Sequence, residues 1–416
     1  MTDVLAPRFE PLDEALLVDP YPTYAFYRDR EPVHWGMPAI EGLPGSWYVF
    51  SYQENAAVLS DAATYASNPA SAGIEGHIPE AFRPMAAIFQ RFLGGIDAPN
   101  HRRLRSIMAK AFTPRRIEAM RPRIESITAA CLDRAMDRGD GTFDVVTDLA
   151  FPIPMSVVGD ALGVVPDDWP LFQGWASDIT HAFDHAADPE AAGRGGQAVQ
   201  AMFDYLAARL AERRSRPGDD LLSAMVAAAD DDGQPMEEFD AIAIACELGF
   251  AGHETTTNSV AKSVLGLMDQ RDQWEALCSA SEATWDVAVE ELLRWTTPVQ
   301  RQRWRWTTVD TELAGRTIAA ATSVVCVLGA ANRDPRLFAD PDRIDFTRAK
   351  PRHLTFGVGE HFCLGSTLAR LELRTALSQL TRRCPELRLA QPPEEIEWHP
   401  NFSLPGPRSV RVRVAP

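Results

Sequence analysis

The sequence predicts a mainly α-helical fold with a minor, discontinuous β region, and two observations predict it. From about residue 100 onward, apolar residues recur three and four positions apart with Pro or Gly at the breaks, which is typical of amphipathic helices. Strand-like segments are few, short and far apart. The length of 416 residues alone predicts two or three domains, but the stretches 186–196 and 230–235 are too short to be tethers between domains.

Local signals place the elements in order along the chain. A helix is predicted after residues 19–22, Asp-Pro-Tyr-Pro, and a strand at 47–50, Trp-Tyr-Val-Phe. Thr113 and Pro114 predict a helix start, because Thr is a favourable N-cap and Pro fits the first helical position. A long amphipathic helix is predicted from about Met236 to Leu267, and further strands are predicted at 303–309, 322–328 and 409–414.

Cysteine spacing and the N-terminal segment indicate in which cellular compartment the protein is expected. The N-terminal segment has no basic region followed by an apolar core, and nowhere do 18 apolar residues run together. We therefore expect a cytoplasmic protein without a signal peptide or a membrane anchor. The cysteines lack the paired spacing of a disulfide framework, an iron–sulfur cluster or a zinc knuckle; they are Cys131, Cys246, Cys278, Cys326, Cys363 and Cys384.

The net charge of −17 disfavours nucleic acid as a partner. Basic residues nevertheless gather in one segment and on one later helix, and they are His101, Arg102, Arg103, Arg105, Lys110, Arg115, Arg116, Arg370 and Arg374. On charge alone, this basic cluster is interpreted as an ordinary solvated face.

Residues 356–365 place one cysteine between a glycine-rich turn and a predicted helix. Gly357 and Gly359 allow turn conformations that other residues avoid. The residues after Cys363 have helical spacing, so its sulfur is expected near a helix N-terminus, where the helix dipole and free N–H groups favour a thiolate. The alternative is a buried structural cysteine.

This segment resembles the heme-binding signature of the cytochrome P450 family, in which a cysteinate is the axial ligand of the heme iron. The resemblance covers nearly the whole chain. It implies the cytochrome P450 fold in one large domain, residues 1–416, and heme b as the cofactor with Cys363 as the metal ligand.

Heme carries two propionate carboxylates, and burying them requires basic partners. His101 and Arg105 stand four apart on one predicted helix face and resemble the family's propionate-binding helix. His361 matches a third contact. Arg305 matches a fourth, with Arg301 and Arg303 as nearby rivals.

The segment 251–258, Ala-Gly-His-Glu-Thr-Thr-Thr-Asn, lies inside the long predicted helix although Gly and consecutive Thr are poor helix formers. Such a local conflict often marks a functional site. The resemblance implies that Glu254 relays protons, that Thr255 assists cleavage of the O–O bond, and that a widened helical turn leaves room for dioxygen. Without the resemblance, this segment is a kinked helix with solvated side chains.

Glu291 and Arg294 are three residues apart, which in most proteins makes a surface ion pair. The resemblance implies instead that this pair is buried and joined by an arginine from a later loop. Arg343, in the Pro-Asp-Arg sequence 341–343, matches that third member.

The predicted function is that of a heme-thiolate monooxygenase, which puts one atom of dioxygen into a hydrophobic organic substrate, as in hydroxylation during natural-product tailoring. The chain has no dinucleotide fingerprint and no iron–sulfur cysteine spacing. We therefore expect electrons from NAD(P)H through a separate ferredoxin reductase and ferredoxin. For the basic cluster, the resemblance implies a second possible role, a docking surface for this acidic electron donor on the cysteine side of the heme. The enzyme is expected to be a monomer. Two alternatives stay open: oxidative coupling, epoxidation or desaturation by the same chemistry, or a non-catalytic heme-thiolate sensor or ligand-binding protein.

The substrate pocket is expected to be largely apolar and lined by five segments. They are 74–92, 169–186, 248–255, 299–300 and 402–404.

Overall fold

The computed structural model describes residues 8–13, 16–17, 19–38, 45–74, 80–139, 141–185, 188–302, 304–349 and 352–414. Most of these residues are helical, which confirms the predicted fold class. The α-helices are α2 (Pro20–Arg30), α3 (Tyr52–Ser60), α4 (Arg83–Phe89), α5 (Asn100–Ala111), α6 (Pro114–Ala119), α7 (Arg121–Met136), α8 (Pro152–Leu162), α9 (Trp169–Asp184), α10 (Pro189–Ser215), α11 (Leu221–Ala227), α12 (Glu238–Asp269), α13 (Arg271–Cys278), α14 (Glu282–Thr296), α15 (Leu328–Ala331) and α16 (Ser366–Arg383).

Short helical turns connect several of these helices. They are the 3₁₀ turns η1 (Pro69–Ala72), η2 (Glu80–Phe82), η3 (Leu93–Gly95), η5 (Pro166–Asp168), η6 (Gly359–His361) and η7 (Pro393–Glu395), and the π turn η4 (Val146–Ala150).

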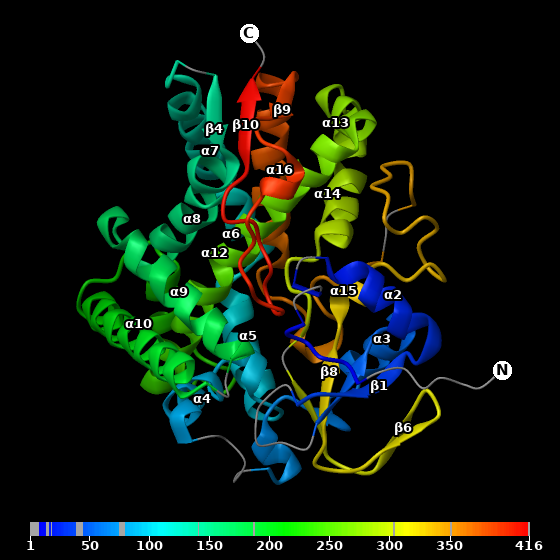
Figure 1. Ribbon diagram of the computed structural model, residues 1–416. Helices are drawn as coiled ribbons and strands as arrows, with labels where there is room; N and C mark the ends of the chain where they lie inside the picture. Colours follow the sequence, from blue (N-terminus) through cyan, green and yellow to red (C-terminus); the bar gives the residue numbers. More distant parts are fainter. Residues whose placement is uncertain are drawn as a thin grey trace, which may run out of the picture.

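The β structure is divided among three small sheets, as the separated strand signals predict. The largest has the strand order β1-β2-β8-β5-β3, another has the order β4-β10-β9, and β6 and β7 form a hairpin. Figure 1 shows the five-stranded sheet and the hairpin on one side of the molecule and the helices α4 and α8–α10 on the other. The strands are β1 (Val33–Gly36), β2 (Ser46–Val49), β3 (Tyr65–Ala66), β4 (Thr142–Asp144), β5 (Arg305–Thr307), β6 (Thr311–Leu313), β7 (Arg316–Ile318), β8 (Ser323–Cys326), β9 (Leu387–Leu389) and β10 (Arg411–Val414).

The helix caps follow the local sequence. Thr113 is the N-cap of α6, and its side chain accepts a hydrogen bond from the backbone N–H of Arg116 at 3.3 Å. Asp19 caps α2 in the same way, accepting from the N–H of Tyr21 at 3.2 Å. Each cap satisfies an N–H that the first helical turn leaves free.

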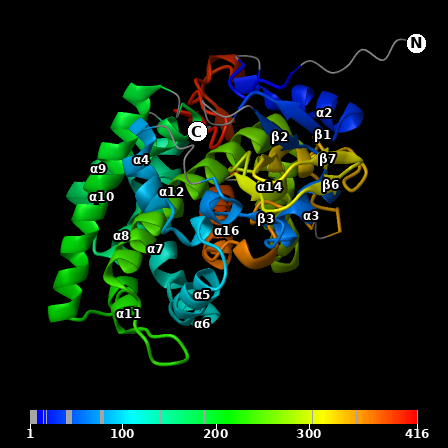
Figure 2. The same ribbon diagram turned by 90° about the horizontal axis from the view of Figure 1, so that it is seen from below.

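Helix α12 runs through the centre of the molecule, with α8, α9 and α10 packed on one side and α14 and α16 on another (Figure 2). Its 32 residues extend for about 48 Å at 1.5 Å per residue. Two large apolar clusters share this helix: Ala243 and Ile244 belong to the one that includes α9 and α10, whereas Val260 and Val264 belong to the one that includes α7 and α16. Burial on both sides fixes α12, so side chains along it have defined positions.

No single helix in the described part of the chain is long and apolar enough to cross a membrane. One bent pair, Val146–Leu162 with Pro166–Asp184, meets the length and composition criteria jointly, and its two parts are bent by 119°.

Candidate active site

Cys363 lies between η6 and α16, in the turn that its glycines predict. Gly357 and Gly359 have φ angles of +67° and +77°, in the region that favours glycine. A Cβ atom on Gly359 would lie 2.6 Å from the carbonyl oxygen of Leu59, so this position also needs glycine for close packing against α3. The N–H of Cys363 donates to the carbonyl of Phe356 at 2.9 Å, which closes the loop just before the helix.

Burial raises the pKa of the Cys363 thiol, while the backbone N–H of Gly365 and the Arg105 guanidinium lower it. Burial is the larger effect, so the predicted help from the start of the helix does not by itself produce a thiolate. A coordinated metal ion deprotonates a thiol outright. The thiolate form therefore belongs to the metal-bound state.

The predicted carboxylate-binding residues lie together beside this loop. The His101 and His361 rings have centroids 4.2 Å apart, and Nε2 of His361 lies 3.0 Å from Oγ of Ser67. Arg105 donates to the carbonyl of Phe362 at 2.5 Å, next to the cysteine. Arg305 enters from β5 and shares the same region, since its charge lowers the pKa of His361.

This group contains two arginine cations, Arg105 and Arg305, and none of its four members forms an ion pair among the described residues. His101 and Arg305 are each only 2% exposed, yet neither ring nitrogen of His101 nor Nη1 of Arg305 has a hydrogen-bond partner among the described residues. Burial and the neighbouring cations lower the pKa of His361 to about 2. Asp97, the acid beside them, already accepts hydrogen bonds from the N–H groups of Ser67 and Asn68.

Unpartnered buried donors are costly, and in a native protein they mark a missing partner. A ligand with carboxylates would supply the acceptors and negative charge that this region lacks. The residues present therefore fit a heme group, with its iron at Cys363 and its propionates at these cations.

The structure separates Arg305 from its rivals. Arg301 donates to Asp184 at 2.8 Å, and these two side chains are 5% and 1% exposed, so its charge is already compensated. Arg303 lies outside the described residues.

Glu254 and Thr255 lie on α12, and their surroundings differ from the expectation of a widened turn. α12 is a regular α-helix through this segment, and Thr255 Oγ1 donates back to the carbonyl of Ala251 at 3.0 Å. Ala251 is exposed and Thr255 half-buried, although the next turn of the helix is buried. The surface of α12 is therefore open at these two positions without a break in the helix.

The carboxyl group of Glu254 is held by a hydroxyl instead of a cation. Its Oε2 accepts a hydrogen bond from Oγ1 of Thr180, on α9, at 2.9 Å. Burial, opposed by the Thr180 hydrogen bond and aided by the negative charge of Asp184, raises the pKa of Glu254 to about 7. A group with a pKa near 7 can both gain and lose a proton under physiological conditions.

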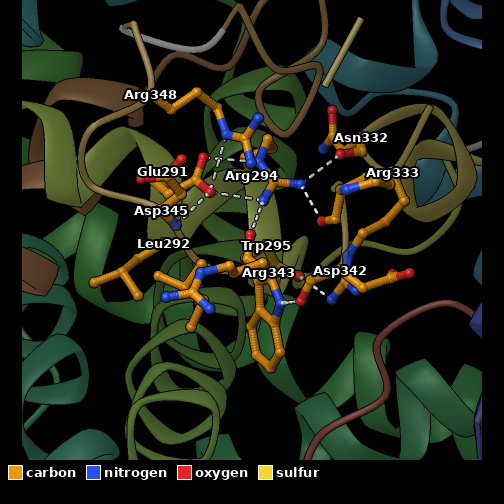
Figure 3. A network of polar contacts seen from close by, with 12 residues as sticks. Glu291, Leu292, Arg294, Trp295, Asn332, Arg333, Asp342, Arg343, Asp345 and Arg348 are labelled. Atoms are coloured by element: carbon orange, nitrogen blue, oxygen red, sulfur yellow. Dashed lines mark hydrogen bonds and ion pairs between the residues drawn. The ribbon is translucent and has the colours of Figure 1, made fainter. Parts of the chain in front are cut away.

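Glu291 and Arg294 form the buried pair that the resemblance implies (Figure 3). Both side chains are fully buried, and Arg294 donates to the two carboxylate oxygens at 2.7 and 2.8 Å. Its remaining N–H groups donate to the carbonyls of Asn332, Pro341 and Arg343 at 2.8–3.1 Å. Every donor of this guanidinium therefore has a partner.

The prediction that Arg343 is the third member is wrong. Only its backbone carbonyl reaches the pair, and its guanidinium points outward to Asp272 at 2.6 Å with both side chains more than half exposed. Arg348 is the third member, since its Nε lies 3.3 Å from Oε1 of Glu291 and its side chain is 12% exposed. The loop turns between these arginines, and its path decides which side chain faces inward (Figure 3).

Sequence reasoning also missed a buried acid on α16. Glu372 is 2% exposed, and its Oε2 accepts from Oγ1 of Thr256, on α12, at 3.2 Å. Burial raises its pKa to about 8. In the sequence it stands between Leu371 and Leu373, and only the packing of α16 against α12 distinguishes it from a surface Glu.

Comparisons with known proteins agree with this site. A sequence model described as cytochrome P450 matches residues 285–408. The chain is 37% identical over 402 residues to the cytochrome P450 monooxygenase PikC of Streptomyces venezuelae, covering 97% of this chain and 92% of PikC. It is 36% identical over 402 residues to 6-deoxyerythronolide B hydroxylase of Saccharopolyspora erythraea, covering 95% and 96% of the two chains.

The fold agrees with a solved structure as well. The polyketide synthase cytochrome P450 PksS of Bacillus subtilis 168 superposes with a TM-score of 0.87 at 30% identity, covering 98% of this chain and 100% of PksS. Sequence similarity at this level over almost the whole length, together with the shared fold, establishes the relationship. The chain belongs to the cytochrome P450 family of heme-thiolate monooxygenases.

Proposed function

We propose that this enzyme hydroxylates a hydrophobic natural product, using one atom of dioxygen and releasing the other as water. The observation that carries the proposal is the Cys363 loop with His101, His361 and Arg305 beside it, whose buried nitrogens lack hydrogen-bond partners among the described residues. The acid–alcohol pair on α12, Glu254 and Thr255, supports it. By their names, one relative hydroxylates 6-deoxyerythronolide B, and PksS is a cytochrome P450 of a bacillaene polyketide synthase. A similar tailoring role is proposed for this chain, as a single domain of residues 1–416 in a cytoplasmic monomer.

Heme b is the proposed cofactor, and Cys363 would bind its iron. When bound, its iron supplies the activation of dioxygen with two electrons. His101, Arg105, Arg305 and His361 would bind its propionates. His101, Arg305 and His361 have buried nitrogens without partners among the described residues, and Arg105 provides a positive charge next to the cysteine.

Glu254 and Thr255 are the proposed catalytic residues. Glu254 would pass protons inward from water because its carboxyl group changes protonation near pH 7. Thr255 would present its hydroxyl to the reacting oxygen from the open surface of α12. This pair argues against the sensor alternative, because a ligand-binding protein has no need for a proton relay.

The proposed substrate is apolar because the pocket segments carry contacting aromatic side chains. The ring of Phe89 lies 4.6 Å from those of Phe92 and Phe183, and Phe183 lies 6.2 Å from Trp304. These side chains are buried and belong to one apolar cluster. We propose that this cluster borders the substrate pocket, which would then admit a hydrophobic molecule. Within the predicted segments, residues 75–79 and 186 lie outside the described part of the chain.

A ferredoxin, reduced by an NAD(P)H-dependent reductase, is the proposed electron donor. Much of the predicted basic cluster is paired within the protein: Arg102 with Glu360 at 2.5 Å, Arg103 with Asp230 at 3.3 Å, Lys110 with Asp231 at 3.1 Å, Arg370 with Glu290 at 2.6 Å and Arg374 with Asp286 at 2.9 Å. Arg115 and Arg116 are exposed at the start of α6, with no ion pair among the described residues. They would provide free positive charge for an acidic partner.

The ferrous carbon monoxide spectrum tests the cofactor assignment. A red-shifted Soret band is expected for thiolate ligation, and its loss in Cys363→Ser would confirm the ligand. A screen of hydrophobic natural products for spin-state changes in the heme spectrum then identifies ligands for turnover assays.

The Thr255→Ala variant tests the reaction. The share of NAD(P)H electrons that reach product should fall and peroxide release should rise. Unchanged coupling would exclude the role of Thr255, and a protein that turns over no ligand with any donor would favour the sensor alternative.

A further inference from the structure

The partner of Glu254 comes from α9, a helix that covers the expected substrate pocket. Thr180 and Asp184 are four residues apart on α9, so they lie on the same face of this helix, one turn from each other. Thr180 donates to Oε2 of Glu254 at 2.9 Å, and the negative charge of Asp184 reaches the same carboxyl group. The acid on α12 is therefore bound to a different element from the one that carries it.

Asp184 fixes this end of α9. Its carboxylate accepts hydrogen bonds from the N–H groups of Phe402 and Ser403 at 2.7 and 3.0 Å, from the hydroxyl of Ser403, and from Arg301 at 2.8 Å. These contacts join α9 to the segment after α14 and to the turn at 402–403. Because Asp184 cannot shift without breaking them, Thr180 is held one turn away, opposite Glu254.

The Thr180 hydroxyl also decides which carboxyl oxygen is available. It occupies Oε2, whereas Oε1 has no hydrogen-bond partner among the described residues. A proton on Glu254 therefore belongs on Oε1, from which it can be passed on. A cation in the place of Thr180 would hold Glu254 ionised. Glu290 shows this effect, because hydrogen bonds from His353 and Arg370 outweigh its burial and hold its pKa at about 2.

We propose that Thr180 is a positioning residue that orients the Glu254 carboxyl group for proton transfer, and that Asp184 fixes α9 so that Thr180 can do so. This proposal rests on the proposed relay function of Glu254. It assigns to a helix over the substrate pocket a direct influence on the proton donor.

The charged groups that face Glu254 define the expected pH behaviour. From α9 the charged group is Asp184, and from the segment after α14 it is Arg301, whose charge Asp184 engages. The turn 402–403 contributes N–H groups and a hydroxyl but no charge.

The experiment measures the protonation of Glu254 directly in the heme-loaded enzyme by infrared difference spectroscopy during a pH titration. The carboxyl band that disappears in Glu254→Gln identifies the residue. In Thr180→Val the ionised form loses its hydrogen bond, so the midpoint should rise by about half to one pH unit. Thr180→Ser keeps the hydroxyl and should restore the wild-type midpoint.

Asp184→Asn has two opposing effects on the same midpoint. Removing the negative charge beside Glu254 makes ionisation easier and lowers the midpoint, whereas loss of the anchor frees Thr180 and raises it. Only the charge effect remains in a Thr180→Val background, so Asp184→Asn should lower the midpoint more in that background than in the wild type; an equal fall in both would show that Asp184 does not hold Thr180. Thr128→Val on α7 is the matched control, since it deletes a buried hydroxyl that donates to the carbonyl of Ile124 far along the chain from this site.

Peroxide release during NAD(P)H oxidation, measured with a spin-shifting ligand, provides a second readout. We expect Thr180→Val to raise it roughly three- to tenfold, less than full loss of a general acid, and Thr180→Ser to restore it. If Glu254→Gln uncouples the enzyme but Thr180→Val changes neither the midpoint nor peroxide release, the proposal is wrong and the relay function stands. If Glu254→Gln has no effect on peroxide release, both the relay function and the role of Thr180 are wrong.

Discussion

Arg294 and Arg305 are both buried arginines in the second half of the chain, but their surroundings differ. Arg294 lies against its own carboxylate, Glu291, and all of its donors are satisfied by protein. Arg305 lies near two histidines and has a buried nitrogen without a partner and no ion pair among the described residues. The complete network stabilises the fold by itself, whereas the incomplete one indicates where an anionic ligand belongs.

Breaking the complete network should have the largest effect. In Arg294→Leu the Glu291 carboxylate is left buried with Arg348 as its remaining cation, and the free energy of unfolding should fall by about 3–5 kcal/mol. Guanidinium chloride unfolding of the heme-loaded enzyme measures this. The double variant Glu291→Leu with Arg294→Leu should recover part of the loss, and a single-variant loss below about 1 kcal/mol would contradict the structural role.

Glu372 extends the comparison to a buried acid without a cation. Its folded pKa of about 8 lies above its ordinary value, so the folded protein keeps a proton that the unfolded chain loses as the pH rises. This stabilising contribution is fully present below the ordinary Glu pKa and is lost as the pH rises toward 8, at up to about 1.4 kcal/mol per pH unit. Glu372→Gln should flatten this part of the stability curve, as measured by urea unfolding from pH 5 to 8.

Glu290 is the control for Glu372. Its pKa is lowered to about 2, so its contribution to the free energy of unfolding is lost only as the pH falls into the acid range. Glu290→Gln should therefore leave the slope from pH 5 to 8 unchanged. An unaltered slope in Glu372→Gln would show that this carboxyl group is ionised in the folded protein.

Removing Arg305 tests the incomplete network. In Arg305→Leu a bound carboxylate loses one of its cations, and heme should leave the protein roughly 30-fold faster, which corresponds to about 2 kcal/mol. Transfer of heme to an excess of a heme-scavenging globin gives this rate. Arg301→Leu is the control, because its charge is used by Asp184; faster heme loss in that variant alone would identify Arg301 as the ligand-binding arginine.

The smallest expected effect is the difference in unfolding free energy between variants of Arg348 and Arg343, the two arginines of the loop after Asp342. Arg348→Ala should lower the free energy of unfolding by about 1–2 kcal/mol, because it removes a hydrogen bond to a buried carboxylate. Arg343→Ala breaks an exposed pair with Asp272 and should cost at most about 1 kcal/mol. Chemical unfolding of both variants measures these losses. A larger loss of unfolding free energy in Arg343→Ala than in Arg348→Ala would support Arg343 as the third member of the buried network.

Local chemistry explains what the sequence predicts correctly about the fold. The cap at Thr113 and the long helix α12 depend on neighbouring residues, and both were predicted within a few positions. The predicted strand at 303–309 is longer than β5, Arg305–Thr307, because its partner strands stop there: Trp306 pairs with Ser323, the first residue of β8, and Thr307 pairs with Tyr65, the first residue of β3. Those partners are distant in the chain, so the local sequence pattern does not predict where the strand ends.

In the candidate site, as in the fold, local features are predicted from the sequence and contacts between distant residues are not. Short motifs locate Cys363, His101 and Glu254, since each motif keeps its spacing in the sequence. Contacts between elements that are distant in the chain cannot be predicted from these motifs. Nothing in the sequence links Thr180 to Glu254, 74 residues later, or distinguishes Arg348 from Arg343.

The hydrogen bond between Ser67 and His361 has a consequence for the order of assembly. It joins residues 294 positions apart, and the contact of Arg105 with Phe362 spans 257. Such distant contacts form late, because the entropy of closing long loops is lost before they add stability. Most of the chain must therefore be synthesised before the residues around His361 can come together. As the proposed heme-binding residues, they would receive heme only after that point, so we expect the yield of active enzyme to depend on the heme supply late in, or after, translation.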